Sequence, residues 1–239
     1  VVASGKLTEQ KRNALLARMT KEVSNLVLRD NYLHTQAITY VASRASDFLD
    51  GQAALIRTLE DKGLLDREIE FLPSDAVIEE RLMAQQGLTR PEIAVLISYV
   101  KNWLYSALLE SDIPDDPFLA ADFTSYFPAP LRADFARRIS SHRLRREIIA
   151  TQVANGLITR MGGAMVSHLA ENTGMPLENI AHAYLVVREA FGLSDLWEGV
   201  ETLDNKVAVC TQTEMFGDIG RLVEQATFWF LRNGDRSLA

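Results

Sequence analysis

The 239-residue chain lacks several features on which particular classes of protein depend. Its single cysteine, Cys210, excludes an intrachain disulfide and a thiolate metal cage, which is typical of a reducing compartment. A net charge of -7 argues against nucleic-acid binding, because neutralising phosphates requires a basic face. No signal peptide is recognisable, and no apolar run reaches the roughly 18 residues that cross a bilayer. We therefore expect a cytoplasmic protein that binds neither nucleic acid nor membrane.

Alternation of polar and apolar residues, the pattern of β-strands, is also missing over any useful length. Apolar residues instead recur at helical spacing through almost the whole sequence. We predict an all-α fold, a multi-helix bundle of mostly antiparallel helices around a long central helix. A boundary near Leu72–Pro73 would divide the chain into a helical segment, 1–72, and a bundle domain, 73–239. One continuous domain is the other interpretation, and both stay open.

Capping signals indicate where several helices begin. Thr8 can cap a first helix, and a second is expected to begin near Asp30 or Asn31, with a possible break at Gly51. The strongest signal is Thr89-Arg90-Pro91-Glu92, a capping box with proline in the first turn. It predicts a helix from about Arg90 to Glu110.

The central helix is expected from Leu144 to Leu169, where apolar residues cover well over half of the circumference. Gly156 and Gly163 lie on its narrow polar strip. A glycine inside a helix costs about 1 kcal/mol relative to alanine. We therefore expect a neighbouring helix to approach closely at these two positions. Gly174, followed by Pro176, is predicted to end this helix.

Motifs of the common enzyme classes are missing as well. Neither Gly162-Gly163 nor Gly217–Gly220 follows a strand or has the spacing of a dinucleotide-binding turn. The aspartates of residues 112–116 lie among prolines and are interpreted as helix caps and solvated charges, not as a magnesium site. The histidines lack metal-binding spacing, and Cys210 has no histidine nearby in the sequence. We assign no catalytic, cofactor-binding or metal-binding residue.

Residues 137–146, RRISSHRLRR, concentrate five arginines and one histidine without an acid. We predict that this segment opens the central helix, where each cation loses about 0.3–1 kcal/mol unless an anion compensates. Three interpretations stay open: an internally paired helix end, a docking contact with a carboxylate-rich surface, or a site for phosphate or an acidic metabolite. The candidate interface residues are Arg137, Arg138, His142, Arg143, Arg145 and Arg146.

Six blocks carry a family resemblance, and they span nearly the whole chain in order: VLRDNYLHTQA (27–37), IEFLPSD (69–75), GLTRPEIAVLISYVK (87–101), DIPDDPFLAADFTSYFP (112–128), HRLRREIIATQVAN (142–155) and AYLVVREAFGL (183–193). They resemble the C-terminal part of the large bacterial NAD-specific glutamate dehydrogenases. The resemblance implies an enzyme that interconverts glutamate with 2-oxoglutarate and ammonium. Its catalytic lysine, glutamate pocket and NAD domain would lie upstream of Val1. GKLT (Gly5–Thr8) resembles the stretch just past the end of that dehydrogenase core.

On this resemblance the chain is a fragment that is inactive alone and binds no cofactor itself, while NAD binds elsewhere in the parent enzyme. Its implied role is structural, oligomerisation or regulatory. The implied partners are the upstream catalytic domain of the same polypeptide and further copies in a homo-oligomer. An autonomous helical interaction module without enzymatic context is the alternative. Exposed aromatic residues are expected to mark the surface that meets the missing domain: Phe123, Tyr126, Phe127, Trp197 and Trp229.

Overall fold

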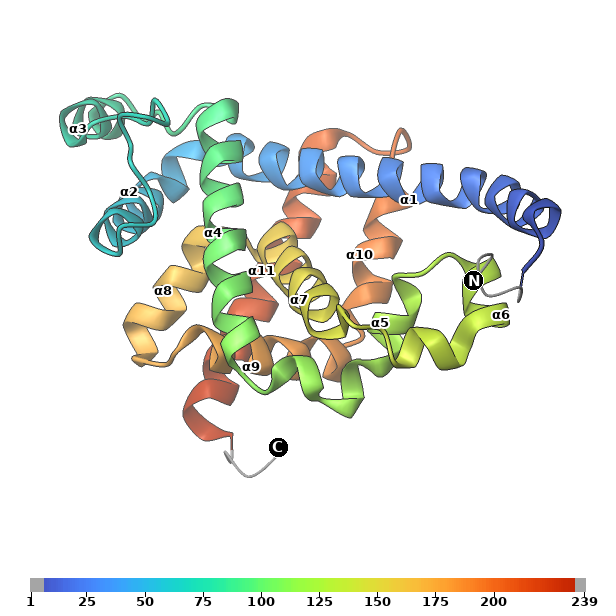
Figure 1. Ribbon diagram of the computed structural model, residues 1–239. Coiled ribbons are helices and arrows are strands. Elements are labelled where there is room, and N and C mark those ends of the chain that lie inside the picture. The colour runs from blue at the N-terminus through green and yellow to red at the C-terminus, as the bar shows by residue number, and fades with distance from the viewer. Residues whose placement is uncertain (1–6, 235–239) are drawn as a thin grey trace.

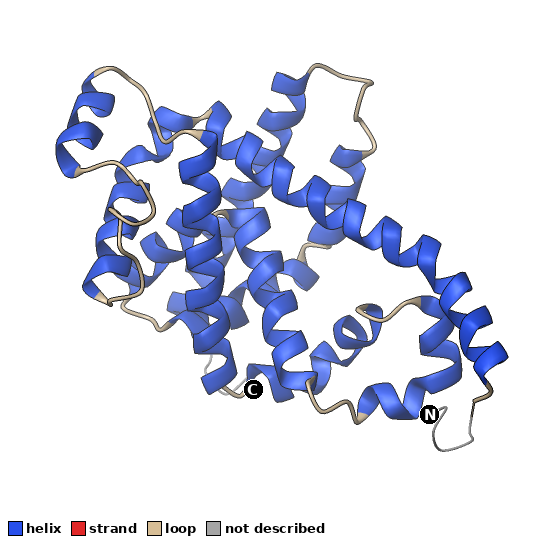
Figure 2. Ribbon diagram, turned by 45° about the horizontal axis from the view of Figure 1, so that its top comes forward, coloured by secondary structure: helices blue, strands red, loops and turns tan. Residues whose placement is uncertain are grey.

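The computed structural model describes residues 7–234, and the regular elements in that range are all helices (Figure 2). The predicted all-α class is therefore confirmed, with no strand in the described part of the chain. None of these helices is long and apolar enough to cross a membrane. In chain order the elements are α1 (Glu9–Ser43), α2 (Ala45–Asp61), α3 (Asp75–Met83), α4 (Arg90–Glu110), the 3-10 helices η1 (Ile113–Asp115) and η2 (Pro117–Leu119), α5 (Ala120–Ser125), α6 (Ala129–Ser140), α7 (Arg145–Met161), α8 (Gly163–Thr173), α9 (Leu177–Ala190), α10 (Leu193–Glu201) and α11 (Val209–Asn233).

Helix α1 is a single 35-residue helix that runs across one side of the molecule (Figure 1). Thr8 caps it as predicted, since its side chain accepts a hydrogen bond from the backbone N of Lys11 at 3.3 Å. The predicted start of a second helix near Asp30 is wrong, and so is the break at Gly51, which lies inside α2. The chain bends instead at Arg44, whose φ of -126° and ψ of 36° separate α1 from α2.

Helices α4 and α7 pack against each other in the middle of the molecule (Figure 1). The limits of α4 agree with the prediction, and the Glu92 carboxylate accepts from the backbone N of Thr89 at 2.6 Å in the capping box. One apolar cluster extends from Val41 to Val223, with fully buried side chains from α4 and α7 such as Leu104 and Leu157. Helices from both sides of residue 72 contribute to it.

The predicted central helix is two helices, α7 and α8, so that expectation is wrong. The chain turns at Gly162, where φ is 78° and ψ is 150°, a conformation that glycine alone adopts readily. The close approach expected at Gly163 is confirmed, because a Cβ there would lie 2.9 Å from Cγ2 of Val100 in α4. The same expectation is wrong for Gly156, where a Cβ would lie 3.9 Å from the Tyr184 hydroxyl.

Candidate functional site

A buried carboxylate joins three helices that are far apart in the sequence. Glu201, at the end of α10, has a side chain that is only 6% exposed. It accepts from Nη2 of Arg29 in α1 at 2.5 Å and from Nη1 of Arg160 in α7 at 2.8 Å. Arg160 also donates to Oε1 of Gln36 at 3.1 Å and lies over the Trp197 ring, 4.8 Å from its centre. These five residues, the Glu201 cluster, tie α1 to α7 and α10 where water screens the charges weakly.

The phenol of Tyr32 lies beside the Glu201 cluster and adds no charge to it. Burial, followed by the carboxylates of Asp204 and Glu201, raises the pKa of Tyr32 to about 12. Its hydroxyl accepts from Nε2 of Gln36 at 3.1 Å. The phenol therefore stays protonated at neutral pH, and the Glu201 carboxylate is the one anion of the cluster that faces its two arginines.

Helix α1 is also attached to α4. Nζ of Lys101 lies 2.6 Å from Nε2 of His34, and Nη2 of Arg90 donates to Oγ1 of Thr39 at 3.1 Å. Both contacts join residues of α4 to the second half of α1. Together with the Glu201 cluster they fix this half of α1 on two sides.

A third attachment joins the first half of α1 to α6. Oε1 of Glu22 accepts from the backbone N of Ala129, in the first turn of α6, at 2.8 Å. The same carboxylate lies 3.6 Å from Nη2 of Arg132, and Arg18 forms an ion pair with Asp134 at 3.7 Å. A carboxylate at a helix N-terminus is favourable, because the free backbone N–H groups there carry positive partial charge.

Between these attachments α1 exposes apolar side chains. Leu16, Val23 and Val27 follow each other at intervals of seven and four residues, so they lie on one side of the helix. All three are exposed, and the Val27 side chain reaches 53%. A surface of this kind is typical of a contact with another domain or chain.

The aromatic residues expected to mark such a surface divide into two groups. Phe123 and Trp197 are buried in the core, so the expectation is wrong for them. Tyr126 and Trp229 are exposed, and Phe127 is half-buried beside α6. The spacing of apolar residues could not separate the two groups. An aromatic side chain at these helices and turns can point either into the core or toward the surface.

Only the last two residues of the arginine segment, Arg145 and Arg146, open a helix, so the prediction is wrong for the rest of the segment. Arg137 and Arg138 belong to the last turn of α6, and α7 begins only at Arg145. Between α6 and α7, side chains form hydrogen bonds with backbone groups and so compete with helical backbone bonding. The Ser141 hydroxyl donates to the Arg137 carbonyl at 3.1 Å, and Nδ1 of His142 accepts from the backbone N of Leu144 at 3.2 Å. The segment is therefore a helix end, a turn and a helix start.

Two arginines of this segment have partners inside the molecule. Nη2 of Arg146 donates to the carbonyls of Leu109 and Ser111, each at 2.9 Å, and its other nitrogen pairs with the Asp115 carboxylate. Arg145 donates to the Pro114 carbonyl at 3.3 Å. Cations are favourable here because the last carbonyls of α4 lack helical partners. These contacts fit the interpretation as an internally paired helix end.

The other arginines face outward. Arg137, Arg138 and Arg143 are exposed, and no hydrogen bond or ion pair of their guanidinium groups is found within residues 7–234. His142 is half-buried, and its ring lies 5.6 Å from that of Phe127, centre to centre. The segment thus contains an inward pair that anchors the end of α4 and an outward set of cations.

The Glu201 cluster could not be predicted from the sequence. Glu201 lies 172 positions from Arg29 and 41 from Arg160, so no motif of fixed spacing contains the three residues. The aspartates near α5 behave more simply: Oδ1 of Asp116 accepts from the backbone N of Phe118 at 2.8 Å and caps η2 as predicted. No group of three or more His, Cys, Asp or Glu residues in the described range is arranged to hold a metal ion.

Comparison with known families agrees with the resemblance seen in the sequence. A family model described as "Glutamate dehydrogenase, C-terminal" matches residues 85–239. The chain belongs to this family. A second family model, "Bacterial NAD-glutamate dehydrogenase, catalytic domain", matches residues 1–41. This match includes nearly all of α1, so the end of the dehydrogenase core expected at Gly5–Thr8 was placed too early.

Curated relatives lead to the same family. The chain is 46% identical over 97% of its length to an NAD-specific glutamate dehydrogenase of Halomonas elongata, and 45% identical over 98% to one of Pseudomonas aeruginosa. It is 32% identical over its full length to the enzyme of that name in Mycobacterium tuberculosis. The chain spans only 14% or 15% of the length of these relatives.

NAD does not fit the described residues. A dinucleotide site of the usual kind combines a strand, a glycine-rich turn and a helix, and residues 7–234 contain no strand. The open cleft beside α6 has a volume of about 270 Å³, below the roughly 300–1,000 Å³ typical of small-molecule sites. No step of dehydrogenase chemistry is therefore assigned to these side chains.

Proposed function

We propose that this chain is the non-catalytic C-terminal helical part of an NAD-dependent glutamate dehydrogenase, and that it holds the end of the catalytic domain in place through α1. The observation that carries this proposal is the contact between Glu201 and Arg29. Arg29 lies in the stretch matched by the catalytic-domain family, and Glu201 lies in the stretch matched by the C-terminal family. Glutamate, NAD and the catalytic lysine would meet in the upstream part of the polypeptide.

The attachments of α1 support a mechanical role. A helix that is bonded to α4, α6, α7 and α10 cannot shift without breaking contacts in each of them. Its exposed apolar side, around Val23 and Val27, would then be covered by the rest of the catalytic domain. On this proposal residues 1–72 and 73–239 act as one continuous domain, because both contribute to the same apolar cluster.

The proposal is tested by one substitution in two contexts. Val27→Glu should leave the stability of the isolated chain within about 0.5 kcal/mol of wild type, because Val27 is exposed there. In the complete dehydrogenase the same carboxylate would be buried without a partner, so both thermal stability and NAD-dependent glutamate oxidation should fall. Asn25→Glu is the matched control, since Asn25 is exposed on the opposite side of α1.

Equal effects of Val27→Glu on the isolated chain and on the complete enzyme would contradict the proposed contact. A second measurement addresses the non-catalytic role. The isolated chain, supplied with glutamate and NAD, should produce no NADH above the background of a protein-free sample. Measurable turnover that follows the concentration of the chain would overturn the proposal.

A further inference from the structure

The turn between α2 and α3 presents an exposed aromatic side chain. Phe71 is 89% exposed, and its φ of 55° places a non-glycine residue in the left-handed region. Ile69 beside it is 70% exposed, and the carboxylates of Glu68 and Glu70 flank the two apolar side chains. We call residues 68–71 the Phe71 knob. Strained backbone of this kind persists where the surrounding structure fixes it, and it concentrates at functional sites.

The knob is held firmly by the helices around it. Arg67 donates two hydrogen bonds to the Glu60 carboxylate of α2, at 2.5 and 2.7 Å, and one to Asp75 of α3 at 3.1 Å. The Tyr99 hydroxyl of α4 donates to Oε1 of Glu70 at 2.6 Å. The exposure of Phe71 is therefore a fixed feature of the fold. A turn whose backbone is fixed in this way loses little backbone freedom when it binds.

An open apolar cleft lies between the start of α1 and α6. Leu15, Phe127, Leu131 and Phe135 line it, and its volume is about 270 Å³. A cavity of about 150 Å³ is enough to hold a benzene ring. The α6 cleft can therefore accept a phenyl ring together with part of a neighbouring side chain.

The polar side chains of the cleft belong to the arginine segment. Arg138 and His142 both line the cleft, and Arg138 is exposed without a side-chain partner in residues 7–234. An unpaired cation such as Arg138 beside an apolar cleft favours a partner with an apolar group next to carboxylates. The Phe71 knob has this composition.

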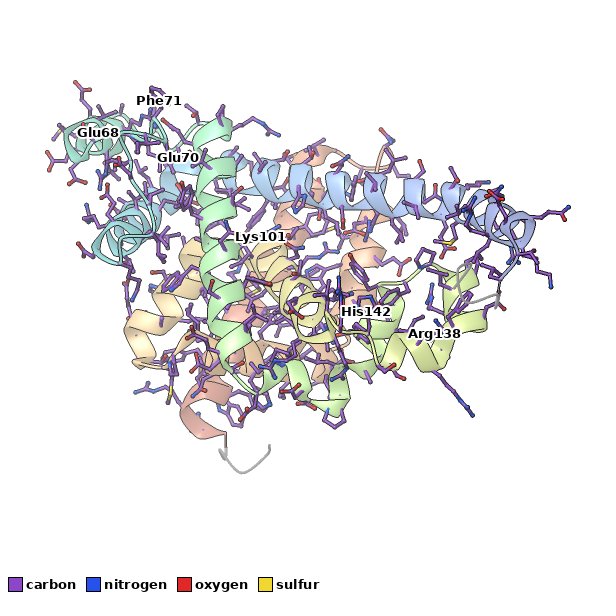
Figure 3. The ribbon with its side chains drawn as sticks, viewed as in Figure 1. Glu68, Glu70, Phe71, Lys101, Arg138 and His142 are labelled. Atoms are coloured by element: carbon purple, nitrogen blue, oxygen red, sulfur yellow. The ribbon has the colours of Figure 1, made fainter. Side chains whose placement is uncertain are left out.

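We propose that the Phe71 knob of one copy of this chain binds in the α6 cleft of a second copy. The ring of Phe71 fills the cleft, and the carboxylates of Glu68 and Glu70 pair with Arg138 and accept a hydrogen bond from the His142 ring. Knob and cleft lie at opposite ends of the molecule, so a chain does not fill its own cleft (Figure 3). An aromatic anchor in a pocket with a charged rim is the arrangement in which interface energy concentrates. This proposal does not depend on the role assigned to α1.

Knob and cleft are different surfaces, and this determines the kind of assembly. Each copy that uses its knob still has a free cleft, so the contact extends a chain of copies, closes a ring, or is exchanged twice in a two-fold dimer. In each of these assemblies, the average molar mass measured in solution should rise with protein concentration. Sedimentation equilibrium measures that mass directly.

Substitutions at the two surfaces should each weaken association. Phe71→Asn removes the ring and keeps a residue that tolerates positive φ, and Arg138→Glu reverses the charge at an exposed position. Each should raise the dissociation constant about tenfold or more, the effect expected of an interface anchor. Phe191→Asn removes another exposed phenylalanine and should leave association unchanged. Circular dichroism and thermal unfolding establish that each variant is folded.

Mixing the two variants gives the decisive result. The Phe71→Asn chain keeps an intact cleft and the Arg138→Glu chain keeps an intact knob, so an equimolar mixture should form a one-to-one complex that neither variant forms alone. Introducing Glu68→Arg into the Arg138→Glu chain should restore self-association, because the ion pair is re-formed with reversed charges. A wild-type chain that stays monomeric at millimolar concentration overturns the proposal. So does a mixture that behaves as the sum of its two components.

The test also separates this proposal from coverage of the cleft by the rest of the same polypeptide. In the complete dehydrogenase, both Phe71→Asn and Arg138→Glu should lower the oligomeric mass while leaving NAD-dependent turnover by the dissociated enzyme intact. Loss of stability from Arg138→Glu alone, with no effect of Phe71→Asn, would assign the cleft to the upstream domain and overturn the contact between copies. A failure of the α1 proposal would change neither result.

Discussion

Nζ of Lys101 in α4 and Nε2 of His34 in α1 lie 2.6 Å apart. The ammonium group has no lone pair, so it donates, and the neutral imidazole accepts through Nε2. Burial lowers the pKa of Lys101 to about 8, against a weaker opposing effect of Asp30. Burial followed by the charge of Lys101 lowers the pKa of His34. The junction between α1 and α4 is therefore least favourable when both groups are charged.

The pH dependence of stability should show this cost. The unfolded chain keeps Lys101 protonated up to its ordinary pKa of 10.5, whereas the folded chain releases the proton near pH 8. In this window the unfolded state binds more protons, so the contribution of Lys101 to the free energy of unfolding rises with pH. Below pH 8, burial of the charged Lys101 side chain lowers the free energy of unfolding by its full amount. This amount is about 1–2 kcal/mol once solvent screening of a half-buried group is allowed for.

Lys101→Met should remove the cost. At pH 7 the variant is expected to unfold at higher urea concentration than wild type, and the difference should disappear as the pH approaches 10.5. Lys21→Met is the control, because Lys21 is exposed on α1 and should change the midpoint little. Parallel stability curves for wild type and Lys101→Met between pH 7 and 10.5 would rule out this explanation.

The Glu201 cluster makes a second prediction. Glu201→Ala leaves Arg160, whose side chain is 12% exposed, without its anion, and breaking a buried ion pair costs about 3–5 kcal/mol. Glu201→Gln keeps an oxygen that accepts hydrogen bonds and should cost about 1–3 kcal/mol. Urea unfolding measures both. Glu198→Gln, at an exposed position of the same helix, should cost less than about 0.5 kcal/mol. A Glu201→Ala chain as stable as that control would show that the cluster does not hold α1.

Two glycines of the expected central helix provide a matched pair for a third prediction. Gly163→Ala would place a methyl group 2.9 Å from Cγ2 of Val100 and should cost about 1–3 kcal/mol through overpacking. The methyl group of Gly156→Ala would lie 3.9 Å from the Tyr184 hydroxyl, and the substitution should stabilise the chain by about 0.5–1 kcal/mol, because alanine favours the helix. Thermal unfolding of both variants checks the opposite signs. Stabilisation by Gly163→Ala as well would mean that the contact with Val100 relaxes at little cost.

Parts of the fold followed from the sequence because their causes are local. The capping box at Thr89 and Glu92, the proline between them and the apolar spacing all act within α4, and its limits were predicted correctly. Asp30 is an equally good cap residue, yet α1 continues through it. A helix cap contributes only about 1 kcal/mol. Contacts with residues that are distant in the sequence, such as Arg29 with Glu201, stabilise the continuous helix more than a cap at Asp30 would stabilise a break.

The arginine segment shows the same limit at the candidate site. Its concentration of charge was visible in the sequence, but the direction of each side chain was not. Arg146 bonds to carbonyls 35 and 37 positions away, at the end of α4, and only the packed fold brings them within reach. The turn at Gly162 was hidden for a related reason, because apolar spacing continues across it and only the backbone conformation reveals the break.

The support of the Phe71 knob leads to the last prediction. Hydrogen bonding from Arg67, opposed by burial, lowers the pKa of Glu60, and Arg67 also lowers the pKa of Asp75. A carboxylate whose pKa is lowered by folding contributes stability above its ordinary pKa, near pH 4.5 for Glu60, and loses it as the pH falls through the folded value. Arg67→Met should therefore cost about 1 kcal/mol at pH 7, allowing for solvent screening, and less at pH 3.

Urea unfolding of wild type and variant at the two pH values measures this difference. Arg57→Met is the control, because Arg57 is exposed and forms an ion pair with Asp75 alone, at 3.2 Å. It should change stability by less than about 0.5 kcal/mol at either pH. If the cost of Arg67→Met were the same at pH 3 as at pH 7, packing of the arginine stem would be its source. The turn would then be held by packing of the Arg67 side chain and not by its ion pairs, and lowering the pH would not loosen the Phe71 knob.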